Sequence, residues 1–533
     1  MTGRKDIPAC LYFLNMKVLS LLFIITLATS GAFGQEETYN KRLSLGFNNL
    51  IFRSVELTDT CFIISGVGRD SFPGSFFSRF DFSGNPIYFK LNKANDQLIR
   101  TWGRDLQEFG ENQWIVSGEG ADSTGGYVII LTQTSQGDTL KIVRFYHPDH
   151  PQEQFIVSSA GLARMGNKWF LQMNIFNSMA SPPSNALFLA KLDQDLAINW
   201  TKLYESSKDE TSRSVLAFGQ NLLIGAWRTN FNTNIKSFNT QLYFLQIDTL
   251  NGDINKTLLY PYTPTNQLLM GPADDMLVEE DGSLIVATRK GKEIVVGSNG
   301  HIFWDGEVLK VNPALNSVQW TCQFRAYQNS PLTQFYKIVM ATGGDGYLTA
   351  GVGILDSIHI GALLAKVSLE GDSLWMRQYM YVTTPSCYNV IYDLEPTPDG
   401  GYVMVGEARP YNALDTLFPP PVQQGWILKV DEWGCLVPGC QLGVATKDAP
   451  AGEDMALKVY PNPAFEVLYI HLPNAGPEGR FRFVDILGRT IREFAASPGD
   501  TTYILPLEGI PAGWYVLQYE EGGRRLAVSV YRL

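Results

Sequence analysis

A repeat organises most of this chain, and it is clearest between Asp345 and Tyr379. DGYLTAG begins an apolar run, ALLAKVSLEGD carries a second run into a turn, and SLWMRQY forms a third. Short runs of β-branched and aromatic residues between Gly, Asp and Asn clusters are typical of strands rather than helices. The first large apolar residue after each turn recurs at intervals of 52 to 63 residues, at Phe62, Trp114, Trp169, Leu222, Leu284, Tyr347 and Tyr402.

A fourth apolar run precedes each of these positions, as in FYKIVMAT at residues 335–342. Four strands in each of seven units, with a period just above 50 residues, are typical of a β-propeller, whose blades are four-stranded sheets around a central channel. We therefore expect an all-β chain with a seven-bladed β-propeller over residues 35–441. An array of β-sandwiches is the alternative, but it needs no such uniform period.

The last unit lacks the third, aromatic-ended run, whereas YNKRLSLG at Tyr39–Gly46 has the same pattern just before the first unit. A ring of blades that does not close leaves an unpaired strand edge, which favours aggregation. We therefore expect residues 39–46 to form the outer strand of the last blade, paired with Trp426–Val430. A disordered N-terminal tail is the alternative.

Composition and charge restrict the classes of function. Charged residues make up 18% and aromatic residues 12% of the chain, which also has 49 Gly, and this is a globular rather than a disordered composition. The net charge of −11 argues against a nucleic-acid partner, because such binding depends on Lys and Arg that neutralise phosphates. At 533 residues the chain is too long for one ordinary core, so a propeller plus a small domain is a natural division.

The N-terminal region contains a secretory signal peptide pattern. MKVLSLLFIITLATSGAFGQ at residues 16–35 combines Lys17, an apolar core and small residues before Gln35. We expect translation to start at Met16 and residues 1–34 to be the signal peptide. The apolar core is too short for a membrane span, so we expect no transmembrane helix in the mature chain; a retained N-terminal anchor is the alternative.

Cleavage at that position leaves five cysteines: Cys61, Cys322, Cys387, Cys435 and Cys440. Only four residues separate Cys435 from Cys440, and we expect them to form a disulfide in an oxidising compartment, worth about 2 kcal/mol by loop entropy. A bridge between Cys61 and Cys387 is left open, because their units are neighbours in a closed ring.

Two classes of connection are long, those between the second and third strands of a unit and those from unit to unit. In an up-and-down blade both emerge on the same face, which is the candidate binding surface. Aromatic side chains there can stack on sugar rings, and polar side chains can donate hydrogen bonds. The candidate binding residues are Trp227, Arg228, His301, Trp304, Arg409 and Tyr411. The alternative is that the aromatic residues pack blades together, as we expect for Trp200, Trp320 and Trp375, which recur at one repeat position.

No local motif for catalysis is present. HPDH at residues 147–150 lies in a Pro-containing turn and lacks the spacing of two metal ligands on a helix, and no nucleophile elbow or Walker loop occurs. We therefore expect no catalytic residues, no metal and no cofactor. A glycan hydrolase or lyase built from loops is the alternative, which carboxylates at catalytic separations in the central depression would favour. A structural surface-layer component, the third reading, predicts no pocket.

After a polar linker at residues 442–455, residues 456–533 show alternating apolar positions with turns about every ten residues, as in a small antiparallel β-sandwich. Three motifs follow one another there: YPNP, D-x-x-G-R, and Leu-x-x-x-Pro-x-Gly-x-Tyr at residues 507–515. With a basic residue near the C-terminus, they resemble the type A C-terminal sorting domain of the bacterial type IX secretion system. The matching residues are Tyr460, Pro461, Asn462, Pro463, Asp485, Gly488, Arg489, Gly513, Tyr515 and Arg532. Trp514 stands where the family commonly has a smaller residue.

This resemblance implies export through the periplasm of a Gram-negative bacterium, with the outer-membrane translocon as a partner. It also implies that the protein is secreted or attached at the cell surface. The repeat region is similar to propeller repeats found upstream of such domains, which supports the fold and leaves the function open. We therefore expect a module that binds or adheres to extracellular polysaccharide or protein.

Overall fold

The computed structural model describes residues 38–532, except 70–72, 93–97, 101–104, 123–124, 147–155, 178–183, 205–208, 233–236, 261–268, 297–298, 328–329, 356–358, 385–386, 411–422, 438–439, 441–456, 461–463, 465–466, 473–478, 486–488, 498–499, 512 and 522–523. The predicted signal peptide and linker therefore lie outside the described residues. The named elements of the described part are all strands, as predicted, and none of its residues form a helix long and apolar enough to cross a membrane. The chain divides into two compact units, Met1–Leu436 and Val437–Leu533.

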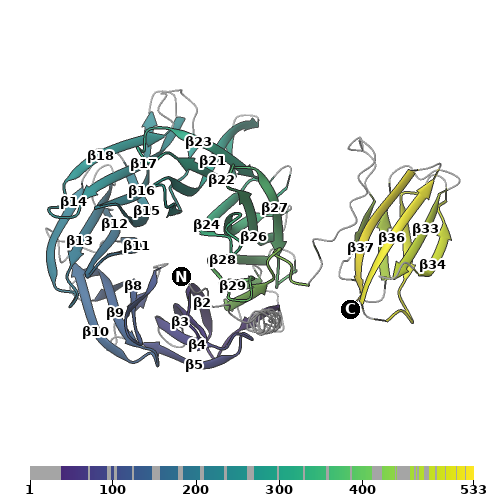
Figure 1. Ribbon diagram of the computed structural model, residues 1–533, viewed down its shortest axis with the longest axis horizontal. Coiled ribbons are helices and arrows are strands. Elements are labelled where there is room, and N and C mark those ends of the chain that lie inside the picture. Colours follow the sequence, from purple (N-terminus) through teal and green to yellow (C-terminus); the bar gives the residue numbers. More distant parts are fainter. Residues whose placement is uncertain are drawn as a thin grey trace, which may run out of the picture. The chain divides into compact units, whose positions relative to one another are not determined.

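The first unit is built from groups of four antiparallel strands, here called blades, which follow one another around a central axis as in a β-propeller (Figure 1). The first blades contain β2 (Asn49–Leu57), β3 (Phe62–Arg69), β4 (Pro73–Phe80) and β5 (Pro86–Asn92); then β7 (Leu106–Gly110), β8 (Gln113–Asp122), β9 (Gly125–Thr134) and β10 (Thr139–Tyr146), with β6 (Leu98–Arg100) also on β8; then β11 (Ile156–Met165), β12 (Lys168–Asn177), β13 (Ser184–Leu192) and β14 (Ile198–Tyr204). The next contain β15 (Asp209–Phe218), β16 (Asn221–Asn232), β17 (Ser237–Asp248) and β18 (Ile254–Tyr260); then β20 (Asp275–Val278), β21 (Leu284–Val296), β22 (Asn299–Val311) and β23 (Val318–Phe324), with β19 (Leu269–Met270) on β21; then β24 (Thr333–Met340), β25 (Gly346–Ile354), β26 (His359–Ser368) and β27 (Ser373–Tyr379). In each blade the first strand lies nearest the axis and the fourth lies at the outer edge (Figure 1).

The remaining blade combines both ends of this unit. It consists of β28 (Cys387–Pro396), β29 (Tyr402–Pro410), β30 (Gln424–Val430) and, at its outer edge, β1 (Tyr39–Leu43). β1 pairs antiparallel with β30, from Tyr39 opposite Lys429 to Leu43 opposite Gly425, which confirms the predicted pairing. The strand ends before Gly46 because the chain turns at Leu45 and Gly46, whose φ angles are 48° and 81°.

The hydrophobic core consists of separate clusters, and most of them lie between neighbouring blades. Where the ring closes, Phe52 and Phe76 of one blade pack with Val403 and Ile427 of the blade that contains β1. Phe52 is fully buried and stacks on Phe76 with 5.6 Å between the ring centroids. Truncating such a side chain to alanine typically costs about 3–5 kcal/mol, so closure is held by side-chain packing as well as by the β1–β30 hydrogen bonds.

A second recurring contact joins each outer strand to the next blade, at the turn between the third and fourth strands. Trp320 of β23 packs against Gly371, where an added Cβ atom would lie 2.6 Å from the indole. Gly371 has a φ of 92°, a conformation that glycine adopts without strain. The equivalent aromatic and glycine pairs are Tyr39 with Gly84, Tyr88 with Gly137, Trp200 with Gly252 and Trp375 with Gly434. The three tryptophans expected in the core are partly exposed at these seams.

Two seams replace the aromatic residue with lysine and the glycine with leucine. Lys141 and Lys256 donate hydrogen bonds to the backbone oxygens of Asp195 and Ala314 in the next turn. The residues that follow these two, Leu196 and Leu315, adopt φ angles of 60° and 53° and are each 2% exposed. A left-handed non-glycine residue costs about 1–2 kcal/mol, whereas burying a leucine side chain contributes about 1.5–3 kcal/mol. Burial therefore offsets the strain, and the two seam types are alternative solutions at one repeat position.

The predicted disulfide between Cys435 and Cys440 is present. Cys61, Cys322 and Cys387 are buried and form no disulfide, so the bridge between Cys61 and Cys387, which the sequence left open, is not formed.

The second unit contains two antiparallel sheets. One has the order β31 (Lys458–Tyr460), β32 (Val467–His471), β35 (Thr502–Pro506); the other has the order β34 (Thr490–Ala495), β33 (Arg480–Asp485), β36 (Gly513–Glu521), β37 (Arg524–Arg532). Leu468 and Ile470 of the first sheet share one core with Phe481 and Tyr519 of the second.

We predict that Gly371→Ala destabilises the first unit more than Gly400→Ala does. Both glycines have φ near 90°, but an alanine at residue 400 would have no atom within 4 Å, whereas at residue 371 it would meet Trp320. The backbone strain of about 1–2 kcal/mol is common to both variants, and overpacking adds about 1–3 kcal/mol at residue 371 only. Urea denaturation measures the difference. Equal losses for the two variants would show that the seam contact does not constrain the fold.

Candidate functional site

The innermost strands carry β-bulges at equivalent positions. The pairing with the second strand skips Arg53 in β2, Arg213 in β15, Tyr336 in β24 and Tyr392 in β28. A bulge re-aims side chains and increases the local twist of its strand. The residues that follow these bulges, Ser54, Ser214, Lys337 and Asp393, together with Asp105 and Asp275, form a set that we call the inner belt.

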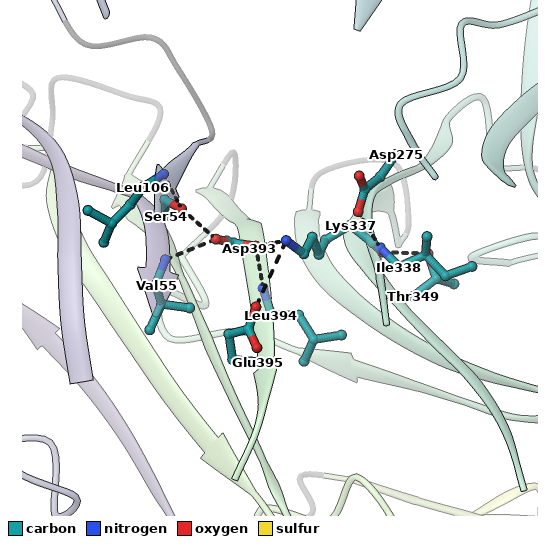
Figure 2. A network of polar contacts seen from close by, with 10 residues as sticks. All are labelled: Ser54, Val55, Leu106, Asp275, Lys337, Ile338, Thr349, Asp393, Leu394 and Glu395. Carbon is teal, nitrogen blue, oxygen red and sulfur yellow. Dashed lines mark hydrogen bonds and ion pairs between the residues drawn. The ribbon is translucent and has the colours of Figure 1, made fainter. Parts of the chain in front are cut away.

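The inner belt connects most blades to the next by side-chain hydrogen bonds or an ion pair. Asp393 accepts hydrogen bonds from the Ser54 hydroxyl, at 2.8 Å, and from the backbone N–H of Val55, at 2.9 Å, across the ring closure (Figure 2). Asp275 accepts the backbone N–H of Ile338 at 3.0 Å. Elsewhere Asp105 accepts that of Leu162, Ser54 accepts that of Leu106, and Ser214 donates to the backbone oxygen of Ala273. These polar side chains satisfy backbone groups that the bulged strands would otherwise leave unpaired.

Lys337 is the cation at the centre of this belt. Its ammonium group lies 3.2 Å from Asp393 and 3.9 Å from Glu395 (Figure 2). Burial alone would lower the pKa of Lys337, but the carboxylates of Asp393, Asp275 and Glu395 outweigh burial and raise this pKa well above its ordinary value. Lys337 therefore stays charged.

Three carboxyl groups near Lys337 have raised pKa values because burial disfavours their charged forms. The pKa of Glu56 rises to about 8, with a further contribution from Glu395. The pKa of Glu395 rises to about 7 and that of Asp105 to about 6, although Lys337 partly opposes both shifts. These three groups therefore change charge closer to neutral pH than ordinary carboxyl groups do.

A small cavity lies beside the inner belt. Its volume is about 40 Å³, which suits one or a few water molecules, whereas small-molecule sites usually measure about 300–1,000 Å³. It is lined by Asp105, Arg213, Ser214, Val215, Asp274, Asp275, Tyr336, Lys337, Tyr392 and Asp393. Among the described residues, no group of three His, Cys, Asp or Glu side chains is placed to hold a metal ion.

Several arginine side chains of the first unit lie over aromatic rings. The guanidinium carbon of Arg53 is 3.8 Å from the ring centroid of Tyr392, and that of Arg409 is 4.8 Å from the centroid of Tyr388. Each contact contributes about 0.5–2 kcal/mol, depending on its desolvation. Arg228 lies over Tyr243 at 4.4 Å and Arg289 over Trp304 at 4.9 Å in the same way. We call these four contacts the arginine–aromatic pairs.

The candidate binding residues belong to three different blades. Trp227 and Arg228 are on β16, His301 and Trp304 are on β22, and Arg409 is on β29. The side chain of His301 and all of Tyr411 lie outside the described residues. Arg228, Trp304 and Arg409 each belong to a separate arginine–aromatic pair, so the structure does not gather them into one cluster. Stacking of sugar rings on Trp227 and Trp304 remains a prediction.

The sequence analysis did not identify Tyr336 and Tyr392 on the innermost strands, or the buried Glu407 that Tyr392 contacts. Glu407 accepts hydrogen bonds from the Tyr392 hydroxyl, at 2.7 Å, and from the Gln423 amide, at 2.6 Å. Tyr336 packs on Tyr392 with 5.6 Å between the centroids. The signal was the position before each belt residue, where FRSVE, SRSVL, FYKIV and IYDLE place Arg or Tyr directly before a polar residue.

In the second unit, several residues in or next to the sorting motifs make hydrogen bonds that stabilise turns or attach a loop to a strand. Arg489 donates its backbone N–H and its Nε to Asp485, at 2.9 Å and 2.7 Å, across the turn between β33 and β34. Ala464, which follows YPNP, donates to the backbone oxygen of Tyr531 at 2.7 Å. The Tyr515 hydroxyl donates to the Pro511 backbone oxygen at 2.8 Å. Tyr460 and Gly513 lie on β31 and β36, whereas Pro461, Asn462, Pro463 and Gly488 lie outside the described residues.

These hydrogen bonds give the motif residues a structural role in the turns of the second unit. The comparison with protein families supports the resemblance to a sorting domain. Residues 458–530 match the family of secretion system C-terminal sorting domains. The chain carries a type IX sorting domain. This domain indicates export to the outer cell surface or secretion in a Gram-negative bacterium, and it implies interaction with the secretion machinery.

Solved structures similar to this chain are β-propellers of diverse function. They include Drosophila Semaphorin 2a, with 9% identity, a TM-score of 0.45, and coverage of 94% of this chain and 98% of that one. The Dos1 propeller has 10% identity, a TM-score of 0.39 and coverage of 74% and 83%. Trypanosoma rangeli sialidase in complex with the inhibitor DANA has 10% identity, a TM-score of 0.37 and coverage of 92% and 89%. A search of curated proteins finds no match.

We predict that the free energy of unfolding falls as pH rises from about 5 to 8. The raised folded-state pKa values of Asp105, Glu395 and Glu56 mean that their stabilising contribution is present at low pH and is lost as each group ionises. Glu56→Gln removes the uppermost of these transitions, so its stability should exceed that of the wild type at pH 8.5 and approach it at pH 5.

Urea denaturation at both pH values measures this effect, and Glu280→Gln, at an exposed position, is the control. A wild-type stability that rises over this range, with Glu56→Gln following the same curve, would contradict the prediction.

Proposed function

We propose that this chain is a secreted or surface-displayed seven-bladed β-propeller, exported through its sorting domain, that binds an extracellular polysaccharide or protein. On this proposal the propeller spans residues 35–441, a linker spans 442–455, and the second unit is a small β-sandwich spanning 456–533. The observation that carries the proposal is the set of arginine–aromatic pairs, because partly exposed planar cations held on flat rings suit extended ligands.

The central carboxylates support binding over hydrolysis. A loop-built hydrolase needs two carboxyl groups that can reach a glycosidic bond. Here Asp393, Asp275 and Asp105 accept backbone hydrogen bonds from neighbouring blades, and the adjoining cavity of about 40 Å³ is far too small for a sugar ring. These side chains therefore hold the ring of blades together, and we assign no catalytic residue.

Binding to a panel of soluble and insoluble polysaccharides, with release of reducing ends followed in parallel, tests this proposal. The mature chain, residues 35–533, should be retained by at least one polysaccharide without product. Trp227→Ala and Trp304→Ala should weaken retention about tenfold, the loss expected when about 1–2 kcal/mol of ring stacking is removed. Release of reducing ends would contradict the absence of catalysis, and retention by none of the polysaccharides would leave a protein as the ligand.

A further inference from the structure

The fold leaves hydrogen-bond donors of Arg409 unsatisfied. Its guanidinium group makes no hydrogen bond to any residue that the structure describes, and its Nε is buried without a hydrogen-bond partner. The nearest carboxylate oxygen belongs to Glu407 and lies 3.9 Å away. Both oxygens of that carboxylate are already used, one by Tyr392 and one by Gln423. The side chain is nevertheless held in place by the ring of Tyr388.

A second guanidinium group lies in the same cluster. Arg53 from β2 packs over Tyr392 from β28, and Tyr392 in turn is hydrogen-bonded to the buried Glu407 of β29. Burial and Glu407 raise the pKa of Tyr388, whereas Arg409 and Arg53 both oppose this rise. Tyr388 packs against the hydrophobic cluster that contains Tyr392, so the two arginine–tyrosine pairs are neighbours. The cluster spans the ring closure, between the blade of β2 and the blade of β28 to β30 and β1.

The chemistry of such a pair is specific. A guanidinium group presents five N–H donors in a plane that matches the two oxygens of a carboxylate or sulfate. Buried donors without partners cost about 1–3 kcal/mol each, so a fold that retains one calls for an explanation. An anionic ligand supplies partners for this guanidinium group, because its exposed edge, on a side chain that is 29% exposed, can donate two parallel hydrogen bonds to the anion. The net charge of the chain is −11, so this local concentration of cations departs from the general charge of the protein.

We propose that Arg409 and Arg53, held on the rings of Tyr388 and Tyr392, bind the acidic groups of an anionic extracellular polysaccharide. The ligand carries either uronate carboxylates or sulfate esters, and its sugar rings lie against the neighbouring tyrosines. This inference rests on the proposed binding function and names the class of its ligand.

Isothermal titration of the full mature chain tests the proposal with four probes: polygalacturonate, its methyl-esterified form, dextran sulfate and dextran. At least one acidic polymer should bind ten or more times more tightly than its neutral counterpart, and the preferred polymer distinguishes carboxylate from sulfate. Arg409→Met keeps an apolar stem on Tyr388 and removes the charge, so it should weaken binding at least tenfold. Arg409→Lys should recover only part of the affinity, because an ammonium group cannot bind in a bidentate manner.

The matched control is Arg377→Met, because Arg377 also lies over an aromatic ring, Trp375, but on the outer strand β27. This variant should bind like the wild type, and thermal melting of every variant establishes that it is folded. Equal binding of acidic and neutral polymers overturns the inference and leaves the proposed binding function standing. Equal losses of affinity in Arg409→Met and Arg377→Met also overturn the inference, because they would show that the polymers bind by general charge attraction.

Equally tight binding of poly-glutamate overturns the assignment to a polysaccharide. Absence of binding to any of the polymers by the folded wild type also overturns the inference, and the proposed function is then tested on protein ligands.

Discussion

The inner belt is the interaction on which the propeller depends. Each bulge takes one residue out of the sheet pairing, and the next side chain reaches across to the adjacent blade, as Asp393 does to the backbone N–H of Val55. A hydrogen bond to a charged group contributes about 1.5–3 kcal/mol, and breaking it would leave a buried donor unpaired. The same bulges place Arg53 and Tyr392 on the axis, so the device that joins the blades also presents the candidate ligand-binding side chains.

At the outer edge the blades are aligned by a different rule. Trp320 on Gly371 and Lys141 on the turn of Leu196 occupy the same place in the repeat. An aromatic ring needs a turn without a side chain, whereas a lysine needs only a backbone oxygen and leaves room for a buried leucine. The two halves of each seam lie on neighbouring blades, so a change in one of them constrains the other. The inner contacts are polar, whereas the outer ones are either ring packing on glycine or lysine hydrogen bonds, and together they restrict how each blade sits on the next.

Much of the fold followed from sequence periodicity. Alternation with period two and the recurring turns located the strands, and the missing aromatic-ended run predicted that β1 would pair with β30. The sorting domain was visible because its motifs are local. The proposed binding region was harder to predict: Arg409 was named as a candidate, but Tyr388, Tyr392 and Arg53 were not. Their contacts depend on bulges and on blades distant in sequence, and no alternation pattern reports either of these.

Closure by β1 also affects how the propeller bears mechanical load. The propeller continues into the sorting domain through the segment after β30, and β30 lies between β29 and β1 with hydrogen bonds on both sides. A pull on that segment, as in flow past a cell to which the protein is attached, acts on a strand held along both edges. Neighbouring hydrogen bonds then share the force, rather than breaking one after another as they would at a free edge. The strand contributed by the start of the chain thus protects the end of the propeller against tension.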